Sequence, residues 1–156
     1  MYKFSDDPEQ HIIGGTSSGA ICAFTAAWYR PDTFRKVISL IGSYVSIGYQ
    51  PATADKPMQP GGDLYPGLIR KSPIRPLKIF LQDGSNDLSN EHGNWFLANQ
   101  QMLSSFEWAN VNADKNGDKG PRYQVQHIWG DGGHSDQHGG SLMPEILRWM
   151  WDGRKI

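Results

Sequence analysis

A serine in a glycine-rich turn is the first candidate for chemistry. Residues 11–24, HIIGGTSSGAICAF, contain the pattern Gly15-x-Ser17-x-Gly19. This pattern is typical of a nucleophilic serine on a sharp turn between a strand and a helix. Such a turn strains the backbone of the serine, and we expect Gly15 and Gly19 to leave the room that side chains would fill. The N–H groups at the start of the helix would then face negative charge that develops at the serine.

The residues on either side of this turn decide whether the pattern carries weight, because glycine and serine are common in the chain. The isoleucines before the turn, Ile12 and Ile13, favour a strand, and the alanines after it favour a helix. We therefore predict a strand over residues 11–16 and a helix over residues 18–30, which is the setting that the pattern requires.

A serine nucleophile needs a base, and the base needs an acid that orients it. His134 is the favoured base because it lies in a glycine-flanked loop after the last predicted strand; His138, four residues further on, is the alternative. Asp83 and Asp87 both follow the third predicted strand and compete for the role of the acid. Asp87 is favoured, because the turn at 84–86 lets its carboxylate bend towards the histidine loop.

The negative oxygen formed in such a reaction needs hydrogen-bond donors. The backbone N–H of Ser18, the residue after the nucleophile, is the predicted oxyanion donor. A second donor normally comes from a loop far upstream, and we expect it to lie outside this sequence, since few residues precede the first strand.

The predicted elements place these residues at one edge of a sheet. Strands are predicted at 11–16, 34–42, 77–82 and 123–129, and helices at 18–30, 64–71, 94–110 and 141–151. The alternation predicts an α/β fold, with a parallel sheet of about four strands and flanking helices. Ligand sites in such sheets lie at the carboxyl ends of the strands, where the candidate serine, aspartates and histidine fall.

A long segment at 44–76 is rich in proline and glycine and contains only the short predicted helix at 64–71. Such a segment either caps a cleft or forms an excursion over the surface, and the sequence leaves both open.

The composition excludes several classes of function. The chain has 156 residues and a net charge of −1, with no basic stripe that would indicate a nucleic-acid or anionic-membrane partner. No apolar run approaches the roughly 20 residues of a membrane span. Its one cysteine, Cys22, cannot form an internal disulfide and is expected in the core. Residues 1–156 are expected to form a single domain.

One run of acidic and amide side chains resembles a calcium-binding loop but lacks two of its required residues. The run Asp114-x-Asn116-x-Asp118 resembles the start of a calcium-binding loop, but Lys119 stands at the sixth position, where glycine is needed, and Val125 at the twelfth, where glutamate is needed. We therefore predict a solvated turn there, and neither a metal nor a cofactor for the chain.

The order serine, aspartate, histidine along the chain is that of α/β-hydrolases. Runs at 14–25, 80–87 and 130–140 resemble the esterase D and enterochelin-esterase-like family of these proteins, and runs at 61–71 and 92–95 resemble a subset of it. The resemblance implies a serine carboxylic-ester hydrolase with Ser17 as nucleophile, Asp87 as acid and His134 as base. Members of the family cleave siderophore lactones, acyl groups on carbohydrates and small aryl or thiol esters, so a small-molecule ester is the implied partner.

The sequence departs from this family at its beginning. The family's domain has several more strands, and the oxyanion loop, before the strand that precedes the serine, so we interpret the chain as the C-terminal half of a larger hydrolase. The strand at 11–16 would then be an unprotected sheet edge that could pair with a second copy. Many members of the family are exported, whereas residues 1–8 lack a hydrophobic signal core, and the localisation is left open. An inactive hydrolase-fold binding domain and an acyltransferase with the same triad are the alternatives.

Overall fold

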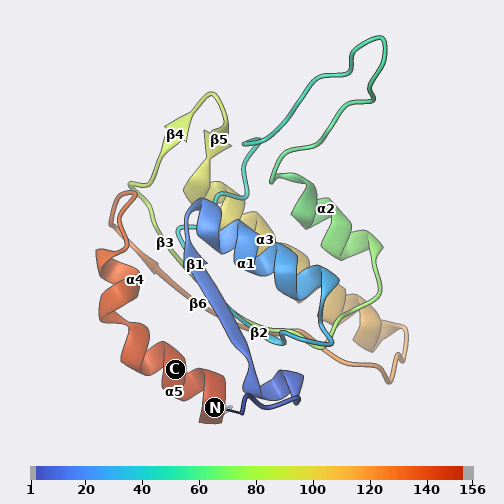
Figure 1. The fold of residues 1–156 in the computed structure, drawn as a ribbon, viewed down its shortest axis with the longest axis vertical. Helices are drawn as coiled ribbons and strands as arrows, with labels where there is room; N and C mark the ends of the chain where they lie inside the picture. Colours follow the sequence, from blue (N-terminus) through green and yellow to red (C-terminus); the bar gives the residue numbers. More distant parts are fainter. Residues whose placement is uncertain (1–2, 153–156) are drawn as a thin grey trace.

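Four parallel strands form the central sheet of the computed structural model, which describes residues 3–152. The predicted domain also includes residues 1–2 and 153–156, which lie outside the described residues. The strands are β1 (Ile12–Thr16), β2 (Lys36–Leu40), β3 (Lys78–Gly84) and β6 (Gln124–Gly130), in the order β1-β2-β3-β6 (Figure 1). The predicted α/β fold with a parallel sheet of about four strands is confirmed.

The register of the sheet aligns the ends of its strands. Ile12 pairs with Lys36, Lys36 with Lys78, and Lys78 with Gln124. Because the strands start at one level and run in one direction, their carboxyl ends lie along a single edge. Among the described residues, β1 and β6 are the two outer strands, as predicted for the strand before the serine. Pairing of β1 with a second copy stays a prediction.

Three helices cover one face of the sheet. These are α1 (Ser18–Tyr29), α2 (Leu64–Lys71) and α3 (Trp95–Lys115). They lie together because the strand order advances steadily across the sheet, so right-handed crossovers place every connection on the same side. Val37, Ile79 and Leu81 point into this layer, where they share a core with Phe24 and Phe106.

The C-terminal helices of the described chain cover the opposite face of the sheet. The short helix α4 (Gln137–Ser141) leads into α5 (Met143–Asp152), which lies across the sheet from α1 and α3 (Figure 1). The strand residues that alternate with those of the first core pack here against α5; the core consists of Ile38, Leu40, Phe80, Ile146, Trp149 and Met150. The Lys78 ammonium donates to the carbonyl oxygens of Trp149 at 2.7 Å and Met150 at 3.2 Å, so a positive charge faces the C-terminal end of α5.

Helix α3 continues five residues beyond its predicted end at Asn110. Ala109 and Ala113, one turn apart, are both buried, so the extra turn still packs against the core. Leu97, near the start of α3, is 58% exposed. Asp114 belongs to the last turn of α3 and pairs with Arg122 at 2.8 Å.

Neither α3 nor any other helix within residues 3–152 is long and apolar enough to cross a membrane.

The predicted helix over residues 141–151 corresponds to α5, which begins two residues later, at Met143; the short helix α4, which was not predicted, precedes it and is separated from it at Leu142. Pro144 explains the break, since proline is tolerated in the first turn of α5 but could not continue the preceding helix. The shift also changes the buried face. Trp149 is buried, whereas Leu147 and Trp151 are 37% and 49% exposed.

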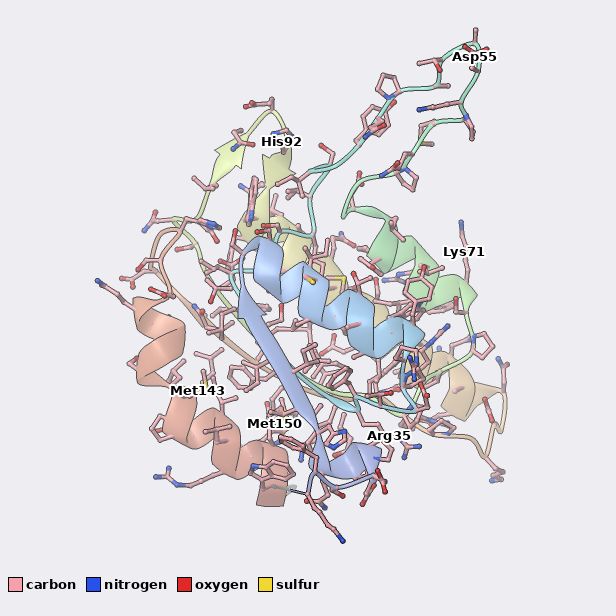
Figure 2. The ribbon with its side chains drawn as sticks, viewed as in Figure 1. Arg35, Asp55, Lys71, His92, Met143 and Met150 are labelled. Atoms are coloured by element: carbon pink, nitrogen blue, oxygen red, sulfur yellow. The ribbon has the colours of Figure 1, made fainter. Side chains whose placement is uncertain are left out.

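The long segment before α2 leaves the body of the protein. Residues 47–60 are exposed, and Asp55 lies at the tip of the excursion, far from the sheet (Figure 2). Helix α2 begins and ends where it was predicted. Two smaller elements complete the described chain: a 3₁₀ turn at Pro8–Gln10 and a two-stranded ribbon of β4 (Ser89–Asn90) and β5 (Gly93–Asn94).

Candidate active site

Every strand of the sheet leads to a residue of the site. Ser17 follows β1, Ser43 follows β2, Asp87 follows β3 and His134 follows β6. In the order β1-β2-β3-β6, β6 lies three strand spacings from β1, and each spacing is about 4.8 Å. The loop that carries His134 must therefore cross back over the edge of the sheet to reach Ser17.

Ser17 has the strained backbone that the turn pattern predicts. Its φ of 57° and ψ of −119° lie in a region that non-glycine residues rarely adopt, at a cost of about 1–3 kcal/mol. Backbone hydrogen bonds to neighbouring segments hold this geometry. The Ser17 N–H donates to the Leu40 carbonyl at 2.9 Å, and the Ser17 carbonyl accepts from the N–H groups of Ser43 at 3.2 Å and Ala20 at 3.0 Å.

Only one of the two motif glycines provides space. A Cβ on Gly15 would lie 2.3 Å from the backbone carbon and oxygen of Gly19, so β1 and α1 can approach each other only with glycine at 15. The expectation for Gly19 is wrong, since a Cβ there would meet nothing within 4 Å. The crowding lies between the Gly15 side of the strand and the helix backbone, and the Gly19 side faces open space.

His134 joins the serine to the aspartate. Its Nε2 lies 2.8 Å from Ser17 Oγ, and its Nδ1 lies 2.6 Å from Asp87 Oδ1. The Asp87 side chain is fully buried, and that of His134 is 24% exposed. With Nδ1–H donating to the carboxylate, Nε2 carries the lone pair that accepts the serine proton. This arrangement suits a serine nucleophile, its base and an orienting acid.

Backbone hydrogen bonds hold the aspartate and histidine loops together. The Ser85 N–H donates to the Gly130 carbonyl at 2.9 Å, and the Asn86 N–H donates to the Gly132 carbonyl at 3.2 Å. The loops approach so closely that a Cβ on Gly84 would lie 2.1 Å from the Gly132 oxygen. Asp87 and His134 are therefore positioned as one unit.

Solved structures of similar shape share this architecture. Enterochelin esterase from Shigella flexneri superimposes with a TM-score of 0.65 at 21% identity, over 96% of this chain and 32% of that one. A ferulic acid esterase gives 0.66 at 17% identity, over 93% and 52%. S-formylglutathione hydrolase from Staphylococcus aureus gives 0.62 at 16% identity, over 96% and 54%. No family model and no curated protein matches the sequence.

The chain has an α/β-hydrolase fold. It spans about a third to a half of the length of the similar structures. In this hydrolase fold, the sheet edge that carries the candidate residues is the edge where the strands end.

The structure does not bring the alternative base to the serine of this hydrolase fold. His138 lies in α4, where the Gln82 side-chain amide donates to its Nδ1 at 3.2 Å. Its ring packs over Gly130, where a Cβ would lie 2.6 Å from it. His134 occupies the position next to Ser17 Oγ instead.

The alternative acid, Asp83, is fully buried next to Asp87. Its Oδ1 accepts from the Gly84 N–H at 2.7 Å and its Oδ2 accepts from the Asn99 amide at 2.6 Å. Burial is the main cause that raises the pKa of Asp83 to about 8, and the hydrogen bond with Asp87 and that group's charge add to it. At neutral pH Asp83 is therefore largely protonated and does not offer the negative charge that orients a histidine.

Two residues of the site were not predicted from the sequence. Ser43 Oγ lies 3.1 Å from Ser17 Oγ, and the Trp95 indole N–H donates to Ser43 Oγ at 3.0 Å. The Trp95 ring also meets the His134 ring edge-on, with centroids 5.9 Å apart. The signal for Ser43 was its place after the second strand, at the same edge as the other candidates. Trp95 stood out in the sequence as an apolar residue at the start of a helix and as part of the run 92–95 that resembles a subset of the esterase family, and neither signal assigns it a contact with Ser43.

A hollow of about 460 Å³ opens beside Ser18. It lies between α1 and the segment before α2, and its lining includes Ser18, Ile21, Cys22, Ile47, Pro60 and Leu64. Cys22 is exposed on this side of α1, so its expected place in the core is wrong. The mostly apolar lining suits a small organic group held next to Ser18.

The two motif glycines should respond oppositely to alanine. Gly15→Ala should lower the free energy of unfolding by about 3 kcal/mol or more, because its methyl group collides with the backbone of α1. Gly19→Ala should be neutral or raise it by up to about 1 kcal/mol, because the space is open and the unfolded chain loses freedom. Urea unfolding of both variants measures this. Equal destabilisation by the two substitutions would contradict the packing described for this turn.

Asp83 should make stability depend on pH. Its folded-state pKa lies near 8, above the ordinary value of 3.8, so between these values the folded state holds a proton that the unfolded state has lost. The contribution of Asp83 to stability is therefore complete below about pH 4, falls as the pH rises towards 8, and is then constant. Asp83→Asn should be most destabilising relative to wild type at pH 5, and the difference should shrink by pH 8. Urea titrations across this range test it; a difference that stays constant with pH would refute it.

Proposed function

We propose that this chain carries the catalytic residues of a serine carboxylic-ester hydrolase that works through an acyl-enzyme. The observation that supports the proposal is the continuous hydrogen-bonded series Ser17 Oγ, His134 and Asp87 Oδ1. Three loops that are far apart in sequence bring these groups to one point. The proposed substrate is a small-molecule ester, such as an acylated carbohydrate, a siderophore lactone or an aryl ester.

Acylation begins at the serine. Ser17 Oγ attacks the carbonyl carbon of the ester, and its proton passes to His134 Nε2. Asp87 accepts the hydrogen bond from His134 Nδ1 and stabilises the imidazolium that forms. When the tetrahedral intermediate collapses, the bond to the leaving alcohol breaks, and the alcohol takes the proton from His134 Nε2. The acyl group is then bound to Ser17 as an ester.

Deacylation repeats these steps with water as the nucleophile. His134 Nε2 takes a proton from water, and the resulting hydroxide attacks the acyl carbon. Collapse of the second intermediate returns the proton to Ser17 Oγ and releases the carboxylic acid. The 24% exposure of the His134 side chain supports this step, since water can reach the imidazole.

The oxyanion is assigned to the start of α1. The Ser18 N–H follows the nucleophile directly and lies at the positive end of a 12-residue helix. The second donor is proposed to come from outside this chain. The names of the similar structures, an enterochelin esterase and a ferulic acid esterase, support an ester as the substrate class.

A fluorophosphonate probe tests the nucleophile. The probe forms a covalent bond with activated serines, so it should label the folded 156-residue chain at Ser17, and Ser17→Ala should abolish the labelling. Ser18→Ala is the matched control, because it removes the neighbouring hydroxyl and leaves the backbone N–H. His134→Ala and Asp87→Asn should slow labelling by roughly 100-fold or more, since both break the series that activates the serine.

Two results would contradict the assignment. One is a folded wild-type chain that the probe does not label, and the other is labelling that persists in Ser17→Ala. His138→Ala should label at the wild-type rate; a loss as large as that of His134→Ala would move the base to His138.

The hollow beside Ser18 should select substrates by size. Ile21→Trp places a large ring in this space, so it should raise KM for an ester with a bulky aromatic acyl group by about tenfold. An acetyl ester with the same leaving group is the matched control, and its KM should change less than twofold. Equal effects on both esters would show that the hollow does not receive the acyl group.

A further inference from the structure

We infer that Ser43 is a positioning residue that fixes the Ser17 hydroxyl for attack. It is the middle member of a directed series of hydrogen bonds that runs from Trp95 through Ser43 to Ser17. The inference rests on the proposed function and adds a residue to it. Ser43 Oγ lies 3.1 Å from Ser17 Oγ and 3.0 Å from Trp95 Nε1, and Ser43 is 1% exposed.

The donors in this series have only one consistent direction. An indole nitrogen can only donate, so Trp95 gives its hydrogen to Ser43 Oγ. When His134 Nδ1–H donates to Asp87, Nε2 is an acceptor, so the Ser17 hydroxyl must donate to it. The single hydrogen of Ser17 is thereby used, and the bond between the two serines has Ser43 as the donor.

The backbone before Ser43 is built to place it there. Ile41 has a φ of 43°, which is a true outlier for a β-branched residue. Its N–H donates to the Gln82 carbonyl at 2.7 Å, which holds this conformation. Gly42 turns the chain where a Cβ would lie 2.4 Å from the Tyr44 ring. Strain of this kind persists where the surrounding structure fixes it, and its result here is that Ser43 faces Ser17.

The hydrogen bond from Ser43 acts on the attacking atom. By occupying one lone pair of Ser17 Oγ, it holds the serine hydroxyl with its proton towards His134. As that proton leaves, Oγ gains negative charge, and the bond from Ser43 becomes stronger, because charged acceptors form stronger hydrogen bonds. The contact lies on the nucleophile, so we expect it to affect the rate of acylation and to leave substrate affinity unchanged.

The test compares Ser43→Ala with Ser39→Ala. Ser39 is a matched control, because it is a fully buried serine on β2 that pairs with the Tyr44 hydroxyl at 2.9 Å. Ser43→Ala should lower both the fluorophosphonate labelling rate and kcat for an acetyl ester by about tenfold, with KM within twofold of wild type. Ser39→Ala should change each quantity less than twofold.

Trp95→Phe tests the direction of the series. It removes the indole N–H and keeps an aromatic ring beside His134, so the labelling rate should fall by about threefold. In a Ser43→Ala background the same substitution should cause no further loss, because Trp95 acts through Ser43. Ser43→Ala alone buries the Trp95 indole N–H without an acceptor, whereas the double variant removes both groups. The double variant therefore replaces Ser43→Ala in the test if the single variant does not fold.

The outcomes separate the two proposals. A wild-type chain that labels, with Ser43→Ala as fast as Ser39→Ala, overturns the role of Ser43 and leaves the proposed function standing. A further loss on adding Trp95→Phe to Ser43→Ala also overturns the series. A folded wild-type chain that does not label removes both proposals.

Discussion

The parallel, in-register pairing of four strands is the constraint on which the site depends. It brings four carboxyl ends to one edge, so residues up to 117 positions apart, such as Ser17 and His134, need only short loops to meet. The order of the strands sets the remaining problem, because the histidine leaves the sheet on the strand farthest from the serine. Backbone hydrogen bonds between residues 85–86 and residues 130–132 hold the histidine loop over the end of β3, on the side of the serine.

Two strained residues stand at neighbouring strand ends, and they support each other. Ser17 and Ile41 both have positive φ values, and the N–H of each donates to a carbonyl of the adjacent strand, at Leu40 and Gln82 respectively. The Ser43 N–H then returns to the Ser17 carbonyl. Both turns are anchored in a sheet with a packed core on each face, so the fold can maintain conformations that would be unstable in an isolated peptide.

Local sequence signals predicted the elements and the principal candidates, and contacts between distant segments decided the rest. The strand–turn–helix around Ser17 could be predicted because its pattern is continuous, and Asp87 and His134 followed from their places after strands. The open space beside Gly19 depends on which neighbours surround it, and hydrophobic periodicity does not show it, whereas the break at Leu142 had a local signal in Pro144. Ser43 was missed because its contacts, Ser17 and Trp95, lie 26 and 52 positions away.

Within residues 3–152 the two faces of the sheet are unequally covered, since three helices lie on one face and the other is covered by α5 and the short α4. The loop that carries His134 leads through α4 into α5, and Lys78 holds the far end of α5 to β3. Local detachment of this one helix would therefore uncover Ile38 and Phe80 and free one anchor of the histidine loop in a single event. Partial opening of the protein at this helix would couple displacement of His134 to the exposure of an apolar, aggregation-prone surface.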